Sequence, residues 1–144
     1  MTSRLNAHAK TQPQVKRLET IFGVGPRTAE KLVATVDDPG RFATGKQVGC
    51  YLGLTQRVYQ SGQMLREGKI SKMGDVHLRT LLIEAAWSSV RREGPMKSLF
   101  DRVSRGMKNR RKVAIVAVAR HLGVTAWAMM RAQTEWIPGR MAYG

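Results

Sequence analysis

Residues 21–33 read Ile21-Phe22-Gly23-Val24-Gly25-Pro26-Arg27-Thr28-Ala29-Glu30-Lys31-Leu32-Val33. The two glycines permit a tight turn. Pro26 suits the first turn of a helix, where its missing N–H costs nothing. Apolar residues at helical spacing on both sides of the turn predict two helices, one over residues 13–22 and one from Pro26 to about Val36. The sequence of residues 13–36 therefore predicts a helix-hairpin-helix.

Such a hairpin can hold the phosphate backbone of a nucleic acid. Gly23 and Gly25 allow the backbone to come close to a phosphate. The second helix then directs its free N–H groups and its positive dipole end at that phosphate. Arg27 and Lys31 add positive charge, and neither needs to read base edges. The alternative is an ordinary helical turn that serves only to pack the fold.

The charge of the chain points to a polyanionic partner. Its 144 residues include 25 Lys and Arg against 10 Asp and Glu, a net charge of +15. DNA and RNA are not distinguished at this level. A membrane partner is disfavoured because the charge is spread along the chain, and because Arg120 and His121 interrupt the most apolar stretch, residues 113–130. Residues 1–12 lack the apolar core of a signal peptide, so we expect a cytoplasmic, nucleoid-associated protein.

Metal and disulfide chemistry is not indicated by the sequence. Cys50 is the only cysteine, which excludes an internal disulfide and a zinc cluster built on cysteines. It lies in an apolar run, residues 48–52, and is predicted to be a buried, inert thiol. The three histidines are far apart and lack ligand spacing. We expect no metal ion in this chain.

Helical patterns dominate the rest of the sequence, so the fold class is predicted to be mainly α. A short helix is expected from Thr44 or Gly45 to Leu52, and the glycine-rich residues 53–74 are expected to form an ordered loop or a short β-hairpin. A long helix is predicted to follow the cap Asp75 and run to Val90. Further helices are predicted from Pro95 and over residues 112–130, separated by a basic hinge, residues 105–112. The predicted organisation is a flexible basic leader (1–12), one domain (13–136) and a tail (137–144).

Several separated motifs resemble one family, the C-terminal transposase domain of the "IS one-ten" insertion sequences, which are DEDD-type recombinases that a bridge RNA can guide. The hairpin is one of these motifs. The others are Tyr51-Leu52-Gly53-Leu54-Thr55, Tyr59-Gln60-Ser61-Gly62, Gly68-Lys69-Ile70-Ser71-Lys72-Met73-Gly74-Asp75, Leu78-Arg79, Leu81-Leu82, Ala85-Ala86 and residues 112–120. The resemblance extends over about residues 18–136. It departs at Gln56, where the family has proline, and at Phe22, where the family has proline between isoleucine and glycine.

The resemblance implies that Ser61 is a nucleophile. In that family the serine of the Tyr-x-Ser-Gly motif attacks a DNA phosphodiester and forms a 5′-phosphoserine link. Phosphoryl transfer needs nearby positive charge, and Gly62 allows a strand to approach. Tyr59 is expected to stack on a base, to orient the phosphate, or to pack within the fold. The cations near Ser61 in sequence, which are expected to contact nucleic acid, are Arg57, Arg66, Lys69, Lys72 and Arg79.

The family's acidic nuclease domain has no counterpart among these residues. That domain binds Mg²⁺ through four carboxylates, whereas the ten acids here show no pattern for two-metal chemistry. Mg²⁺ is therefore expected only with the missing domain. The resemblance implies as partners the DNA of element ends and targets, a guide RNA, the nuclease-like domain or protein, and further copies in a dimer or tetramer. We expect the chain to be inactive alone.

Other residues have two interpretations. A basic cluster, comprising Lys108, Arg110, Arg111 and Lys112, is either a solvated surface or a phosphate contact, and cations at a helix N-terminus favour an external anion. His77 is predicted to be an exposed helix histidine, with general base for Ser61 as the alternative. The three tryptophans, Trp87, Trp127 and Trp136, are predicted to pack in the core rather than stack on bases.

Two other functions compete with a transposase domain that carries a nucleophile. The first is a non-catalytic DNA- or RNA-binding module, either a domesticated remnant or a regulator, that uses only the hairpin. The second is a ribosomal or structural RNA-binding protein, since such proteins are also basic and can contain a hairpin. Formation of a covalent protein–DNA adduct separates the transposase from the first alternative, and preference for structured RNA over duplex DNA at matched salt favours the second.

Overall fold

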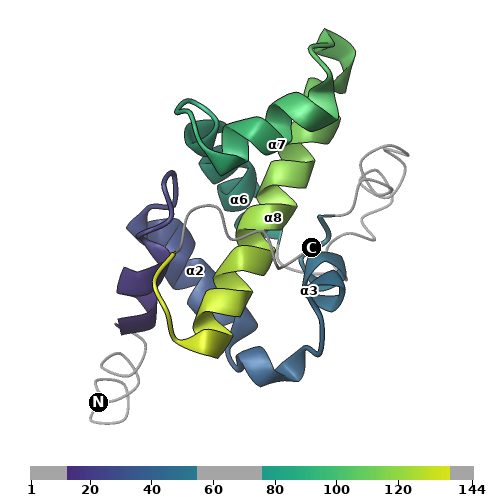
Figure 1. Cartoon of the computed structure of the whole chain (residues 1–144). Helices are drawn as coiled ribbons and strands as arrows, with labels where there is room; N and C mark the ends of the chain where they lie inside the picture. Colours follow the sequence, from purple (N-terminus) through teal and green to yellow (C-terminus); the bar gives the residue numbers. More distant parts are fainter. Residues whose placement is uncertain (1–12, 55–75, 137–144) are drawn as a thin grey trace, which may run out of the picture.

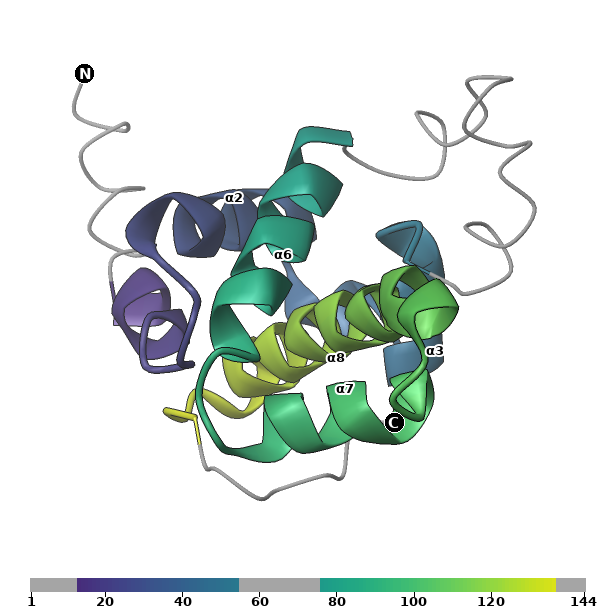
Figure 2. The same cartoon turned by 90° about the horizontal axis from the view of Figure 1, so that it is seen from above.

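Helix α8 (Arg111–Ala132) runs through the middle of the fold, and the other helices pack around it (Figures 1 and 2). The computed structural model describes residues 13–54 and 76–136. Most side chains of α8 are buried, from Ala114 to Met130, because the helix is apolar on nearly all sides. Within the described ranges it is the one helix long and apolar enough to cross a membrane, and 78% of that stretch is buried in the fold. It is therefore the core helix that the sequence predicts.

Three helices pack directly against α8, and a fourth packs mainly on one of them. These three are α3 (Gly45–Tyr51), α6 (Val76–Ser89) and α7 (Pro95–Ser104). Helix α2 (Pro26–Val36) packs on α6 and more lightly on α8. All the described elements are helical and no strand occurs among them, so the predicted mainly α class is confirmed for this part of the chain.

The helices begin where local chemistry favours a start. Pro26 and Pro95 open α2 and α7, as predicted, because the first turn needs no proline N–H. Thr44 caps α3, and its hydroxyl accepts a hydrogen bond from the Gln47 N–H at 3.3 Å. The predicted long helix is α6, and the predicted last helix is α8. Asp75 lies outside the described residues, so its capping role stays a prediction.

The turn between α2 and α3 is held in place by hydrogen bonds within it and to α8. The Asp38 side chain accepts a hydrogen bond from the Gly40 N–H at 2.9 Å, and a short 3-10 helix, η1 (Pro39–Arg41), follows. The indole N–H of Trp127 donates to the Pro39 carbonyl at 2.8 Å. The turn predicted at residues 37–40 is therefore confirmed, and Trp127 is a core residue as expected.

Three expectations from the sequence are corrected. The first helix ends at residue 18 rather than at Phe22, because Thr20 donates from its hydroxyl to the Arg17 carbonyl at 2.6 Å and the chain turns there. Cys50 is exposed, not buried, since Val48 and Gly49 occupy the inner face of the short helix α3. The predicted hinge at 105–112 contains an ordered 3-10 turn, η3 (Lys108–Arg110), that runs directly into α8.

Candidate nucleic-acid interface

The hairpin turn is anchored to helix α6 by Gly23. Its φ is +97°, and a Cβ at this position would lie 2.8 Å from the Ser89 nitrogen and 2.9 Å from the Ala85 carbonyl oxygen. Gly23 therefore lets the backbone of the turn pack closely against the backbone of α6. Ala29, which the sequence places between the helices of the hairpin, is fully buried on α2. The packing explanation that the sequence left open therefore accounts for Gly23.

The start of α2 differs from the turn because it faces solvent. Gly25 is the N-cap residue, is exposed, and has no atom within 4 Å of where a Cβ would lie. No side chain caps this helix, and its first turn contains no acid. Arg27 is exposed, and Lys31 lies one turn further on the same face, half-buried. Free N–H groups, the helix dipole and one exposed cation therefore coincide at an open surface.

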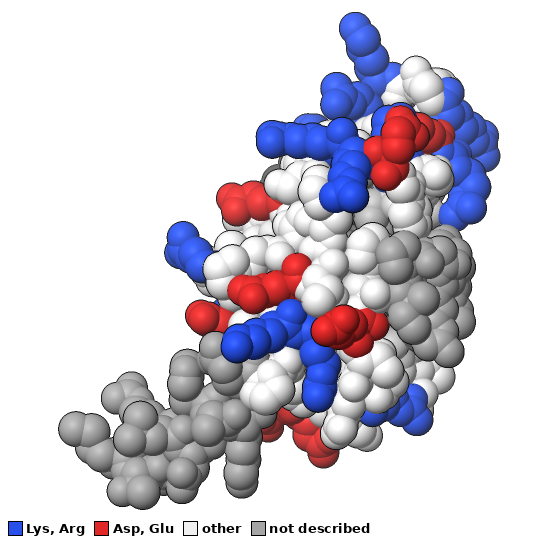
Figure 3. Space-filling view, turned by 60° about the vertical axis from the view of Figure 1, so that its left-hand side comes forward, with Lys and Arg blue, Asp and Glu red and all other residues white. Residues whose placement is uncertain are grey.

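A second basic surface lies where α7 ends and α8 begins. We define this basic tip by its six cations, Arg102, Arg105, Lys108, Arg110, Arg111 and Lys112, which are accompanied by one acid, Asp101, in residues 101–112. Figure 3 shows Lys and Arg gathered at this end of the molecule. The first turn of α8 has no acid and no side-chain cap. The helix dipole is therefore unfavourable for Arg111 and Lys112 in this turn, and an external anion would offset that cost.

Two of the six cations of the basic tip also serve the fold. The Arg110 side chain donates from Nε to the Val103 carbonyl at 3.0 Å and is half-buried. The Arg111 guanidinium lies 5.4 Å from the centre of the Trp87 ring, a cation–π contact. Lys108 and Lys112 are exposed and have neither of these contacts.

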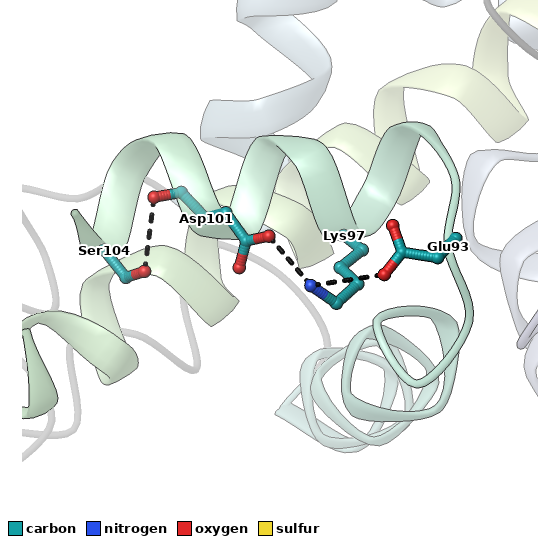
Figure 4. A network of polar contacts seen from close by, with 4 residues as sticks. All are labelled: Glu93, Lys97, Asp101 and Ser104. Atoms are coloured by element: carbon teal, nitrogen blue, oxygen red, sulfur yellow. Dashed lines mark hydrogen bonds and ion pairs between the residues drawn. The ribbon is translucent and has the colours of Figure 1, made fainter. Parts of the chain in front are cut away.

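Lys97 on α7 forms ion pairs with two acids, Glu93 and Asp101, the second of which lies beside the basic tip. Lys97 lies 2.9 Å from the Asp101 carboxylate and 3.6 Å from that of Glu93, and the Ser104 hydroxyl donates to the Asp101 carbonyl at 3.4 Å (Figure 4). The hydrogen bond to Asp101, and then the charges of Asp101 and Glu93, raise the pKa of Lys97. Because Asp101 is engaged with Lys97, it offsets less of the charge at the tip.

The predicted nucleophile and most residues around it lie outside the described residues: Arg57, Tyr59, Ser61, Gly62, Arg66, Lys69 and Lys72. The described residues on both sides of them are in contact. Arg79, on the first turn of α6 and 3% exposed, packs so closely on Gly53 that a Cβ there would collide with its guanidinium. Arg79 is thus a buried support between α6 and the end of α3. His77, the alternative general base, is exposed on α6.

The described residues contain no group of three or more His, Cys, Asp or Glu side chains placed to hold a metal ion. Mg²⁺ needs oxygen ligands gathered around one point. The donor set in residues 13–54 and 76–136 therefore does not fit the Mg²⁺ of the acidic nuclease domain.

Comparison with known proteins agrees with the motif resemblance. Residues 15–101 match the family described as Transposase IS116/IS110/IS902. The chain is 35% identical to a "Probable family 20 transposase" of Pseudomonas aeruginosa over 138 residues, which cover 94% of this chain and 41% of that protein. It is also 35% identical to the "Transposase for insertion sequence element IS1111A" of Coxiella burnetii, over 92% of this chain and 37% of that protein.

A more distant relative bears a different description. The "Pilin gene-inverting protein" of Moraxella bovis is 26% identical over 129 residues, 88% of this chain and 40% of that protein. The chain thus spans about two fifths of the length of these relatives. No solved structure matches it.

Proposed function

Because this chain belongs to the IS116/IS110/IS902 transposase family, we propose that it is the nucleic-acid-binding part of an insertion-sequence transposase and contains the serine nucleophile. The observation that carries the binding proposal is the open, acid-free start of α2, with Gly25 and Arg27 exposed. Such a helix start holds a backbone phosphate without reading its sequence. The net charge of +15 supports the same conclusion.

The two basic surfaces lie at different places in the fold, one at the hairpin and one where α8 begins. The residues before the hairpin turn are joined to the segment that follows α8, since the backbone N–H of Trp136 donates to the Thr20 hydroxyl at 3.0 Å. The basic tip lies at the N-terminal end of α8. The hairpin and the tip can therefore contact separate segments of backbone, which suits a protein that handles element ends and target together.

Removal of one charge at α2 tests the binding proposal. We expect Arg27→Gln to weaken binding of the full chain to unrelated DNA duplexes, and to reduce the slope of log K against log salt by about 0.9. Fluorescence anisotropy over a salt series gives both values. Lys46→Gln is the matched control, because Lys46 is an exposed cation on α3. If Arg27→Gln weakens binding no more than Lys46→Gln, the hairpin is not the binding surface.

For Ser61 the proposal rests on the Tyr-x-Ser-Gly motif. The Ser61 oxygen forms a bond to a DNA phosphorus, the bond from phosphorus to the 3′ oxygen breaks, and a 3′ hydroxyl leaves while the 5′ phosphate stays on the serine. The nuclease-like part must be supplied separately, and a guide RNA and further copies of the chain complete the assembly in the cytoplasm. Suicide substrates with the nuclease part in trans should trap an adduct with the unaltered chain and none with Ser61→Ala. If the unaltered chain never forms an adduct, it is a non-catalytic binding module.

A further inference from the structure

We propose that a pocket between α6, α7 and the start of α8 receives one unpaired nucleotide of a bound strand. This inference rests on the proposed nucleic-acid binding and adds a second, base-contacting site to it. The pocket has a volume of about 430 Å³ and is lined by Trp87, Val90, Arg91, Phe100, Arg111 and the Lys97–Asp101 pair. That volume lies within the range of pockets that hold small ligands.

Aromatic rings form one wall of the pocket. The Trp87 and Phe100 rings are 5.9 Å apart between centroids and inclined at 59°, and both side chains are half-buried. They pack against the core on one side, as the sequence predicts for Trp87. Arg111 lies over the Trp87 ring, and the aromatic surface that the core and Arg111 leave uncovered lines the pocket. A base that enters it can stack on an aromatic side chain, a contact that every base can make because each has a π face.

The charges around the pocket suit a nucleotide phosphate. Lys97 is already paired with Asp101 and Glu93. Arg91 and Arg111 are both exposed and provide the cations available to a phosphate. Arg111 is also part of the basic tip, so a strand held there passes the mouth of this pocket. Charge at the tip thus brings the backbone close, and the aromatic wall accepts a base.

A second pocket among the described residues lacks this chemistry. It has a volume of about 600 Å³, lies between the hairpin turn and the start of α7, and is lined by Glu19, Phe22, Arg92, Glu93 and Trp136 among others. Arg92 lies over the Phe22 ring at 4.8 Å, and two acidic residues, Glu19 and Glu93, are among the lining residues. Two acids repel a phosphate, so the pocket at Trp87 is the one that fits a nucleotide.

Photocrosslinking tests the site directly. The full chain is irradiated with single-stranded DNA or RNA in which iodouracil replaces thymine or uracil, and the crosslinked peptide is mapped by mass spectrometry. We expect the crosslink at Trp87 or Phe100. Comparison of crosslinking with DNA and with RNA strands identifies which nucleic acid supplies the base. Crosslinks that map only to other residues would overturn the proposal.

Affinity measurements separate stacking from structural damage. We expect Trp87→Leu to weaken single-strand binding about tenfold, in line with the loss of one stacked base, and to leave duplex binding unchanged. Trp136→Leu, which removes another half-buried tryptophan, controls for lost packing. Arg131→Gln controls for Arg111→Gln, because both guanidiniums lie over tryptophan rings, at 5.5 and 5.4 Å.

The outcomes distinguish this inference from the function on which it rests. A chain that binds duplexes but not single strands overturns the pocket alone. A chain that binds neither overturns the proposed function and the pocket with it. If Trp87→Leu weakens single-strand binding no more than Trp136→Leu, or Arg111→Gln no more than Arg131→Gln, the aromatic wall is only part of the core.

Discussion

At each end of α8 an arginine lies over a tryptophan ring, but the two pairs have opposite effects. At the C-terminal end, Arg131 lies over Trp127, whose buried indole donates to Pro39. At the N-terminal end, Arg111 lies over the half-buried Trp87 beside a pocket. The helix dipole favours a cation in the last turn and disfavours one in the first. One end therefore stabilises the fold, whereas at the other end charge that disfavours folding is available to an anion.

The largest expected effect comes from breaking the fold at the hairpin, where Gly23 packs on the C-terminal end of α6. Gly23→Ala places a Cβ within 3 Å of the α6 backbone at a φ of +97°, and we expect it to lower the free energy of unfolding by about 2–4 kcal/mol. Urea denaturation gives this value. Gly106→Ala is the matched control at the basic tip, because Gly106 has a φ of +72° and open space around it. It should cost about 1 kcal/mol, and an equal cost for both variants would contradict the contact with α6.

A smaller effect follows from charge reversal at the start of α8 and charge removal at its end. Lys112→Glu places an acid in the first turn of α8, so we expect the free energy of unfolding to rise by about 0.3–1 kcal/mol while nucleic-acid affinity falls. Arg131→Gln should lower the free energy of unfolding by a similar amount and leave affinity unchanged. Urea denaturation and anisotropy measure the two properties. A stability change of the same sign in both variants would remove the contrast between the ends.

His121, in the middle of α8, makes the free energy of unfolding depend on pH. Burial, and then the nearby Arg120 and Arg102, lower the pKa of His121 below its ordinary value of 6.5. Above that pH the imidazole is neutral in both states. As the pH falls below it, the unfolded chain takes up the proton first, so the free energy of unfolding decreases until the folded chain is protonated too.

Urea denaturation at neutral and mildly acidic pH should therefore show a smaller loss of stability for His121→Gln than for the unaltered chain. His77→Gln, an exposed histidine on α6, controls for removal of an imidazole. An identical pH dependence in the unaltered chain and the His121→Gln variant would show that His121 does not contribute.

Local chemistry made the helix starts predictable. Pro26, Pro95 and Thr44 act through their own backbone and side-chain groups, so the sequence alone located α2, α7 and α3. The apolar run of α8 likewise predicted a central helix. These features depend on neighbours in sequence and need no knowledge of the packing.

Predictions that depended on packing between distant residues were less accurate. Cys50 lies in an apolar run, yet α3 is so short that only one face is covered and the thiol points outward. The role of Gly23 could not be inferred, because its partner is the backbone of α6, more than sixty residues away. The pocket at Trp87 combines three helices, and no local pattern indicates it. Ser61 stays a prediction from its motif.

The contact between Arg79 and Gly53 has an evolutionary consequence. It joins the two points of the fold from which the chain leaves and to which it returns around Ser61. When the ends of a segment are fixed in this way, its length can change at little cost, since each doubling of a flexible loop adds only about 0.6 kcal/mol of closure entropy. Members of this family can thus vary the length of the segment that contains Ser61 while the same helices keep folding.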